Sequence, residues 1–349
     1  MNNLLKTTLA GALVISILAC ENTHEAHDST PSTAAIPAIT HDALFVVNGG
    51  SNSLSVINTE TDNIAGTIAL KNAKFPHHIS LSADKQWLAL AVPGADLSGG
   101  HSHTGHTHVA GMFMIIKAQT GEMKSFKTLP EMNHNAVFSP KGDGIWTTQM
   151  IEDGTVKIFN ANSLDEMSTI SVGSAPAEVT FSHNGKYAFV ANSGSNSVSV
   201  IDPALKTVVK TISVGSGPVG AWAGSDNVMY VDNETGKSIT AIDASTLEVT
   251  RTYQLGFTPA MAMNVGQELW VTDTQNGKVV IFKTDSDEKI REIATGAGAH
   301  AIAFNANKTK AYITNQSANT VSVIDVEAKN VLKTISVGSK PNGAVFRAK

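Results

Sequence analysis

Apolar and polar residues alternate along most of the chain after residue 43, and β-branched residues hold many of the apolar positions. The stretches "AFVANSGSNSVSVID" at 188–202 and "AYITNQSANTVSVID" at 311–325 show this pattern, broken by small polar residues. Alternation with a period of two predicts half-buried strands, and the small polar breaks predict hairpin turns. Helical periodicity is hardly visible, so the sequence predicts an all-β protein.

The same pattern repeats along the chain. "TISVGS" occurs at 169–174, 211–216 and 334–339. The repeats are aligned on the residue that opens the first strand of each unit: His77, His134, Ala177, Val219, Ala260, His300 and Asn342. Most units are about 42 residues long, which is the length of a four-stranded propeller blade. We therefore predict a seven-bladed β-propeller.

The two ends of the repeat region complement each other. The C-terminal "NGAVFRAK" supplies only the first strand of a blade, whereas residues 43–70 supply only the other three strands. Joining them leaves no sheet edge open between the last blade and the first. We expect the C-terminal strand to close the ring in this way.

The N-terminal residues are typical of an exported protein. Lys6 precedes an uncharged apolar run from Leu9 to Ala19, which is too short to cross a bilayer, and Cys20 follows directly. This pattern resembles a lipoprotein signal at residues 1–19, with Cys20 as the lipidated residue. A cleaved secretory signal with an incidental cysteine is the alternative. We expect residues 20–42 to form a flexible tether, residues 43–349 the propeller, and the protein to lie in the periplasm or cell envelope, lipid-anchored.

Composition narrows the chemistry. The chain has a single cysteine, which excludes an internal disulfide, a cysteine-rich zinc site and attached c-type haem. The net charge of -5 gives no electrostatic footprint for nucleic acid. Any metal would be held by histidine and carboxylate groups.

One unit is about fifteen residues longer than the others, and its excess is a histidine-rich insertion at about 93–110. Within it, "GGHSHTGHTH" at 99–108 contains His101, His103, His106 and His108. The insertion lies between the second and third strands of its blade. This loop lies on the same face of the ring as the start of the first strand, because the first strand runs away from that face and the second strand runs back to it.

Three more histidines belong to that face. His77, His134 and His300 occupy the same aligned position in blades two, three and seven, beside the central channel, and His78 and Glu178 stand next to such positions. Imidazole nitrogens converging on one point suit a borderline-soft divalent ion. We predict a channel site for zinc, with copper as an alternative that histidine count cannot separate. Asp232 ends a second strand on this face, and we interpret it as a turn residue.

The "VAN…NSVSVID…TISVG…P" units resemble the YVTN-type β-propeller repeats of bacterial envelope and surface proteins. With "FPHHIS", the histidine loop and "MNHNAVF", the chain also resembles periplasmic zinc metallochaperone propellers of the Azt type. This resemblance implies a zinc carrier or store that supplies the substrate-binding protein of an ABC metal importer, and not an enzyme. A non-catalytic envelope scaffold and a metal-dependent propeller enzyme are the alternatives.

Overall fold

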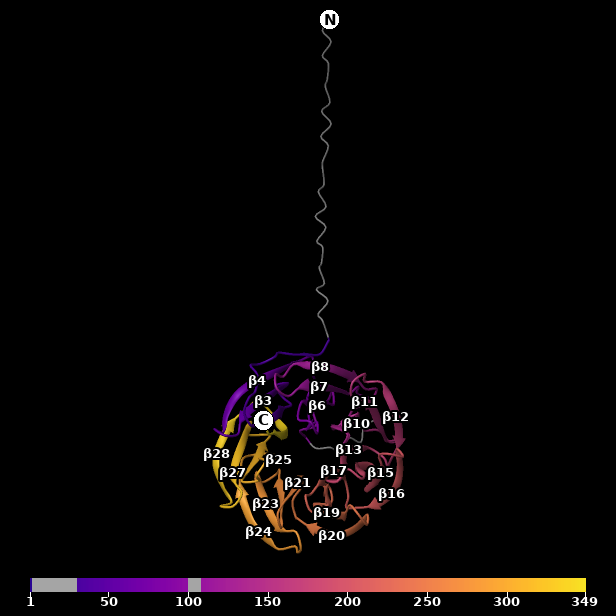
Figure 1. Cartoon of the computed structure of the whole chain (residues 1–349), viewed down its shortest axis with the longest axis vertical. Helices are drawn as coiled ribbons and strands as arrows, with labels where there is room; N and C mark the ends of the chain where they lie inside the picture. The colour runs from indigo at the N-terminus through magenta and orange to yellow at the C-terminus, as the bar shows by residue number, and fades with distance from the viewer. Residues whose placement is uncertain (2–29, 100–107) are drawn as a thin grey trace. The chain divides into compact units, whose positions relative to one another are not determined.

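The computed structural model is a closed ring of seven antiparallel sheets, which confirms the predicted seven-bladed β-propeller (Figure 1). The structure describes residues 1, 30–99 and 108–349. Pro31–Lys349 form one compact unit. The predicted signal peptide beyond Met1 and the predicted lipidation site Cys20 lie outside the described residues.

Each blade contains four strands, in order from the channel outward. Blades one to three consist of β29 (Pro341–Arg347), β2 (Ala43–Asn48), β3 (Ser53–Asn58) and β4 (Asn63–Lys71); β5 (Ile79–Leu81), β6 (Trp87–Val92), β7 (Met112–Lys117) and β8 (Met123–Thr128); and β9 (Ala136–Phe138), β10 (Gly144–Gln149), β11 (Thr155–Asn160) and β12 (Glu166–Ser171).

Blades four to seven follow the same order. They consist of β13 (Pro176–Phe181), β14 (Ala188–Asn192), β15 (Ser197–Asp202) and β16 (Thr207–Ser213); β17 (Pro218–Ala223), β18 (Val228–Asn233), β19 (Ser238–Asp243) and β20 (Glu248–Gln254); β21 (Pro259–Val265), β22 (Glu268–Asp273), β23 (Lys278–Lys283) and β24 (Lys289–Ala294); and β25 (Ala299–Phe304), β26 (Lys310–Asn315), β27 (Thr320–Asp325) and β28 (Asn330–Ser336). A short 3-10 turn, η1 (Ser193–Ser195), follows β14.

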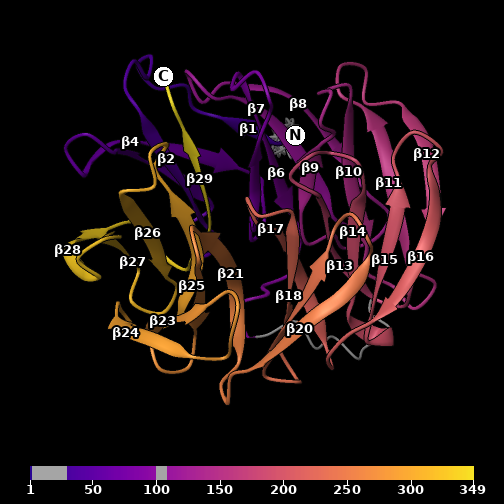
Figure 2. The same cartoon turned by 60° about the horizontal axis from the view of Figure 1, so that its bottom comes forward.

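The C-terminal strand closes the ring as predicted. β29 pairs antiparallel with β2, from Ala43 opposite Arg347 to Asn48 opposite Pro341, and the two strands lie side by side in Figure 2. Strands from both ends of the chain therefore complete blade one. The ring has no unpaired inner edge at this junction, which removes a site of intermolecular strand pairing.

The segment after residue 30 is part of the folded unit, although the sequence favoured a flexible tether as far as residue 42. β1 (Ser32–Thr33) pairs with the outer strand β4. The amide of Ile36 donates to the carbonyl of Thr120 in blade two at 2.9 Å, and Ile39 is buried. Apolar side chains at these two positions provide the contact that holds the segment across blades one and two.

The core lies between neighbouring blades. The second and third strands of a blade are buried on both faces, as in β14 and β15, whereas outer strands such as β16 alternate exposed and half-buried residues. Each apolar cluster joins two adjacent sheets; Phe189 of blade four, for example, packs in one cluster with Val231 of blade five. Among the described residues no helix is long and apolar enough to span a membrane.

A repeated hydrogen-bond motif fixes the turn between the second and third strands. The side-chain amide of Asn192 donates to the hydroxyls of Ser197 and Ser199 at 3.1 and 3.0 Å. The same arrangement occurs at Asn48, Asn233 and Asn315. This motif holds the channel face of four blades in one conformation, so residues at equivalent positions reach equivalent places around the ring.

Candidate metal and active site

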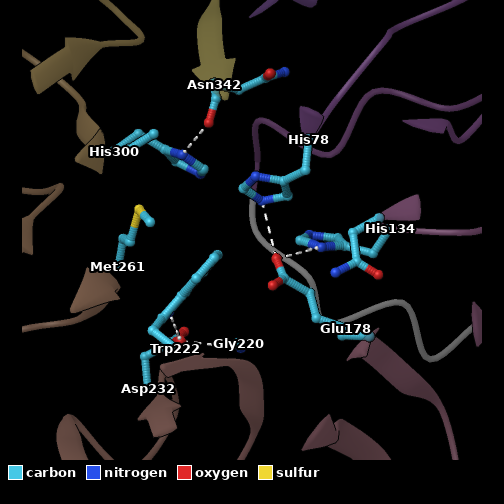
Figure 3. A network of polar contacts seen from close by, with 12 residues as sticks. His78, His134, Glu178, Gly220, Trp222, Asp232, Met261, His300 and Asn342 are labelled. Carbon is cyan, nitrogen blue, oxygen red and sulfur yellow. Dashed lines mark hydrogen bonds and ion pairs between the residues drawn. The ribbon is translucent and has the colours of Figure 1, made fainter. Parts of the chain in front are cut away.

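Four histidine side chains from three blades gather in the central channel, where the innermost strands begin (Figure 3). His77 and His78 precede β5, His134 precedes β9, and His300 is the second residue of β25. The amide of His77 donates to the carbonyl of Ala91, and the amide of Ala91 donates to the carbonyl of His78, at 2.9 and 3.0 Å. Strand β6 thus holds the backbone of both adjacent histidines.

The geometry of this histidine cluster fits one metal ion. The candidate ligand atoms of His77, His78 and His134 lie within 4.8 Å of one another. The ring of His300 lies further away, with its centroid 5.9 Å from that of His77 and 6.0 Å from that of His78. His77, His134 and His300 are 2%, 0% and 6% exposed, so the cluster is buried. Three of the predicted residues can therefore hold a metal, with His300 beside them.

A residue next to an aligned position can reach the channel where the innermost strand is bulged, as in β13. The pairing of β13 with β14 shifts between Pro176 and Val179, and Glu178 lies within the shift. A bulge interrupts the strict alternation of side chains, so a residue next to an aligned position can also reach the channel. Asn135 behaves differently: its side-chain amide donates to the carbonyl of Val179 in the next blade at 2.9 Å.

Glu178 connects two of the histidines. Its Oε1 lies 3.0 Å from Nε2 of His78 and 2.9 Å from Nδ1 of His134, and its side chain is 1% exposed. Both contacts are within ion-pair distance, and because a carboxylate can only accept, they would be hydrogen bonds if these two ring nitrogens carried protons. The lone pairs of the two rings would then lie on Nδ1 of His78 and Nε2 of His134. A carboxylate that orients metal-binding imidazoles is a recurrent arrangement in metal sites.

His300 is oriented by the strand that closes the ring. Its Nδ1 lies 2.8 Å from the carbonyl oxygen of Asn342 in β29, and a carbonyl can only accept, so Nδ1 carries the proton and Nε2 the lone pair. The side-chain amide of Asn342 donates to the carbonyl of Pro76, directly before His77. Asn342 therefore links the two ends of the cluster without offering an imidazole itself.

Of the four loop histidines, the structure describes only His108. Its side chain is 75% exposed, and its Nδ1 lies 2.7 Å from Oε1 of Glu131 at the rim, so the contact it makes is outside the cluster. His101, His103 and His106 lie outside the described residues, and their role as ligands stays a prediction. The stem before them is attached to the neighbouring blade one, where Lys340, directly before β29, bonds to Asp96 and to the hydroxyl of Ser98.

The channel also contains a tryptophan that the sequence did not single out and an aspartate that was interpreted wrongly. The ring centroid of Trp222 in β17 lies 5.8 Å from that of His78 (Figure 3). Its Nε1 donates to Oδ1 of Asp232 at 2.7 Å, and the amide of Gly220 donates to the same oxygen at 3.0 Å. Burial, and then the charges of Glu234 and Glu178, raise the pKa of Asp232 well above its usual value. Asp232 is thus a buried acid that accepts hydrogen bonds from the neighbouring strand and from Trp222, rather than a residue whose hydrogen bonds lie within a turn.

Comparison with known proteins relates the chain to one protein family and to several solved structures. The family model described as "Lactonase, 7-bladed beta-propeller" matches residues 117–341. The chain is also similar to the periplasmic gluconolactonase of Pseudomonas aeruginosa, with a TM-score of 0.71 and 17% identity over 88% of this chain and 99% of that one. A candidate 6-phosphogluconolactonase of Bacteroides fragilis gives a TM-score of 0.69 and 16% identity over 88% and 98% of the two chains.

A third similar structure is the dihydro-heme d1 dehydrogenase NirN, with a TM-score of 0.64 and 10% identity over 90% of this chain and 79% of that one. At these identities the three likenesses show the fold. No curated protein matches the sequence.

These findings correct two of our expectations: that the protein is a zinc metallochaperone or store, and that it is not an enzyme. The matched family is one of lactonases, and it points to a hydrolytic enzyme. The expectation rested on the resemblance to Azt-type propellers, carried by "FPHHIS", the histidine loop and "MNHNAVF". In the structure, however, His134 and Glu178 are 0% and 1% exposed, which suits retention of an ion rather than its transfer. The YVTN-type resemblance is supported as far as the seven-bladed fold, and the Azt-type resemblance gains no support. The importer protein as a partner stays an untested prediction.

Proposed function

Because the chain belongs to the lactonase, 7-bladed β-propeller family, we propose that it hydrolyses a cyclic ester at the channel histidine cluster with the help of a bound divalent metal ion. The observation that carries this proposal is the buried group of His77, His78 and His134, whose ligand atoms lie within 4.8 Å of one another. In the matched fold, the channel face is also where a small ring can reach side chains from several blades.

We propose zinc as the ion. Catalytic zinc sites have three protein nitrogen or oxygen ligands and keep one position open, and the three histidines supply such a set. With N–H groups facing Glu178, the lone pairs of His78 and His134 would lie on their other ring nitrogens. Copper(II) binds the same donors and generally binds them more tightly than zinc does, so the metal content must be measured rather than assumed.

The reaction would add water to the carbonyl carbon of the lactone and break the bond from that carbon to the ring oxygen. The proton lost by the water would end on the released alkoxide, giving a hydroxy acid. A bound divalent ion would polarise the carbonyl and favour deprotonation of water. The residues of this chain would orient the imidazoles through Glu178 and Asn342 and enclose the substrate against Trp222. They would also keep the site poor in water, since the cluster is buried.

The test is lactone hydrolysis by the purified, untagged protein, followed by proton release before and after removal of metal. We expect activity to fall to background after chelation and to return with zinc. His134→Ala should abolish both the activity and the tight binding of zinc. His183→Ala is the matched control, because His183 is exposed in the turn between β13 and β14, on the opposite face. Hydrolysis that persists in metal-free protein and in His134→Ala would refute the proposal.

We also propose that the enzyme is exported and lipid-anchored through Cys20. The apolar run before Cys20 supports this, and the similar gluconolactonase of Pseudomonas aeruginosa is described as periplasmic. Metabolic labelling with a fatty-acid analogue should mark the wild-type protein and not Cys20→Ala. Equal labelling of the two would contradict the anchor.

A further inference from the structure

One wall of the channel is formed by an aromatic side chain that only blade five provides. In β17, Gly220 occupies the position that holds Glu178 in blade four and Met261 in blade six. A Cβ atom on Gly220 would lie 2.5 Å from Cε2 of Trp222 and 2.5 Å from Oδ1 of Asp232. The missing side chain therefore makes the room in which the indole of Trp222 lies, with its ring 5.8 Å from that of His78 (Figure 3).

Asp232 fixes this indole. The equivalent position in blades three, six and seven is a threonine, and the hydroxyls of Thr272 and Thr314 accept the amides of Met261 and Ala301 on their own innermost strands. Oδ1 of Asp232 accepts the corresponding amide of Gly220 and, in addition, the Nε1–H of Trp222. An aspartate at this position thus does what the threonines do and also anchors the aromatic ring. Oδ2 of Asp232 is buried and makes no hydrogen bond.

From these two observations we infer that Trp222 is the residue on which the ring of the substrate packs, and that the site selects lactones whose ring presents a C–H face to the indole. The inference rests on the proposed lactone hydrolysis and names its substrate class. A flat aromatic side chain binds the C–H face of a small ring. The indole is held by Asp232 and its ring lies 5.8 Å from that of His78, so a ring packed on it would lie next to the histidine cluster.

The experiment measures the hydrolysis of glucono-δ-lactone by the zinc-loaded full chain. Trp222→Ala should raise KM about 10-fold, because an aromatic contact of this kind contributes that much. Trp222→Phe should restore most of the loss, and zinc content should stay at the wild-type level. No effect of Trp222→Ala on KM would overturn the inference.

Binding separates this inference from the proposed function. The δ-lactam analogue of this lactone is not hydrolysed, and its binding should change the fluorescence of the wild type but not that of Trp222→Phe, whose other tryptophans are Trp87, Trp146 and Trp270. Hydrolysis that depends on metal but not on Trp222 would leave the proposed function standing and refute this inference. Selective binding of the lactam without hydrolysis of any lactone would refute the proposed function instead.

Discussion

The Glu178→Gln substitution tests whether the carboxylate orients the metal ligands. One oxygen of Glu178 serves two imidazoles, at 3.0 and 2.9 Å. A neutral amide oxygen accepts less strongly, and losing the charge assistance costs about 1 kcal/mol for each hydrogen bond. Two such losses amount to about 2 kcal/mol, which lowers zinc affinity about 30-fold. The free energy of unfolding of the metal-free protein should rise or stay the same, because the substitution removes a buried charge.

The assay is competition for zinc between the protein and a chelator of known affinity, together with denaturant unfolding of the metal-free protein. Glu131→Gln is the matched control: Glu131 also contacts a histidine, but that histidine is the exposed His108 at the rim. The control should keep wild-type affinity at the tight site. An unchanged zinc affinity in Glu178→Gln would refute the assigned tautomers, and with them the orientation of His78 and His134.

Three further outcomes follow from single contacts. Burial raises the pKa of Asp232 well above 3.8, so the native protein keeps a proton that the unfolded chain releases. The free energy of unfolding of the wild type, relative to that of Asp232→Asn, should therefore fall as the pH rises above 3.8. Urea unfolding at several pH values measures this difference, and a difference that does not change with pH would contradict the prediction. Gly220→Ala should displace Trp222 and lower the free energy of unfolding by about 1–3 kcal/mol, because the added Cβ would lie 2.5 Å from the indole. Tryptophan fluorescence measures the displacement and denaturant unfolding measures the loss of stability. Wild-type values in both assays would show that the indole does not need this space. Asn342→Ala removes the hydrogen bond to the carbonyl of Pro76 and should lower the free energy of unfolding by about 1 kcal/mol. Zinc affinity should stay the same, because the backbone carbonyl of residue 342 still orients His300. Weaker zinc binding would contradict the role given to this backbone carbonyl.

The fold follows from the sequence because the repeats are regular. The period, the "NSVSVID" segments and the complementary ends determine the number of blades and the closure through β29. The segment around Ile36 and Ile39 could not be assigned this way, because it lies outside the repeat and its order comes from packing on two blades. Local composition there is that of a tether, and tertiary contacts decide the outcome.

The sequence predicted the site residues that occupy equivalent positions in the repeats. It missed the residue whose role depends on a position where one blade differs from the others. Aligning the units placed His77, His134 and His300 on one face, and the structure brings their rings together. The role of Trp222 depends on the absence of a side chain at Gly220, and an absence gives no signal to a search for reactive residues. The aligned threonines at the position of Asp232 were the available signal, since an acid among threonines at a buried position needs an explanation.

The repeat also explains why the resemblance carried by the histidine motifs misled the functional interpretation. Those motifs suggested metal transport, yet a channel position that recurs in seven blades can carry an imidazole, a carboxylate or a thioether without changing the fold, as at His78, Glu178 and Met261. The chemistry of such a ring therefore lies in how neighbouring blades differ from one another. In this chain the differences fall around one channel, with a carboxylate and imidazoles in blades two to four and the indole of Trp222 in blade five. That arrangement gives a ligand two unlike faces, which an ion alone would not require and which a small ring to be hydrolysed would use.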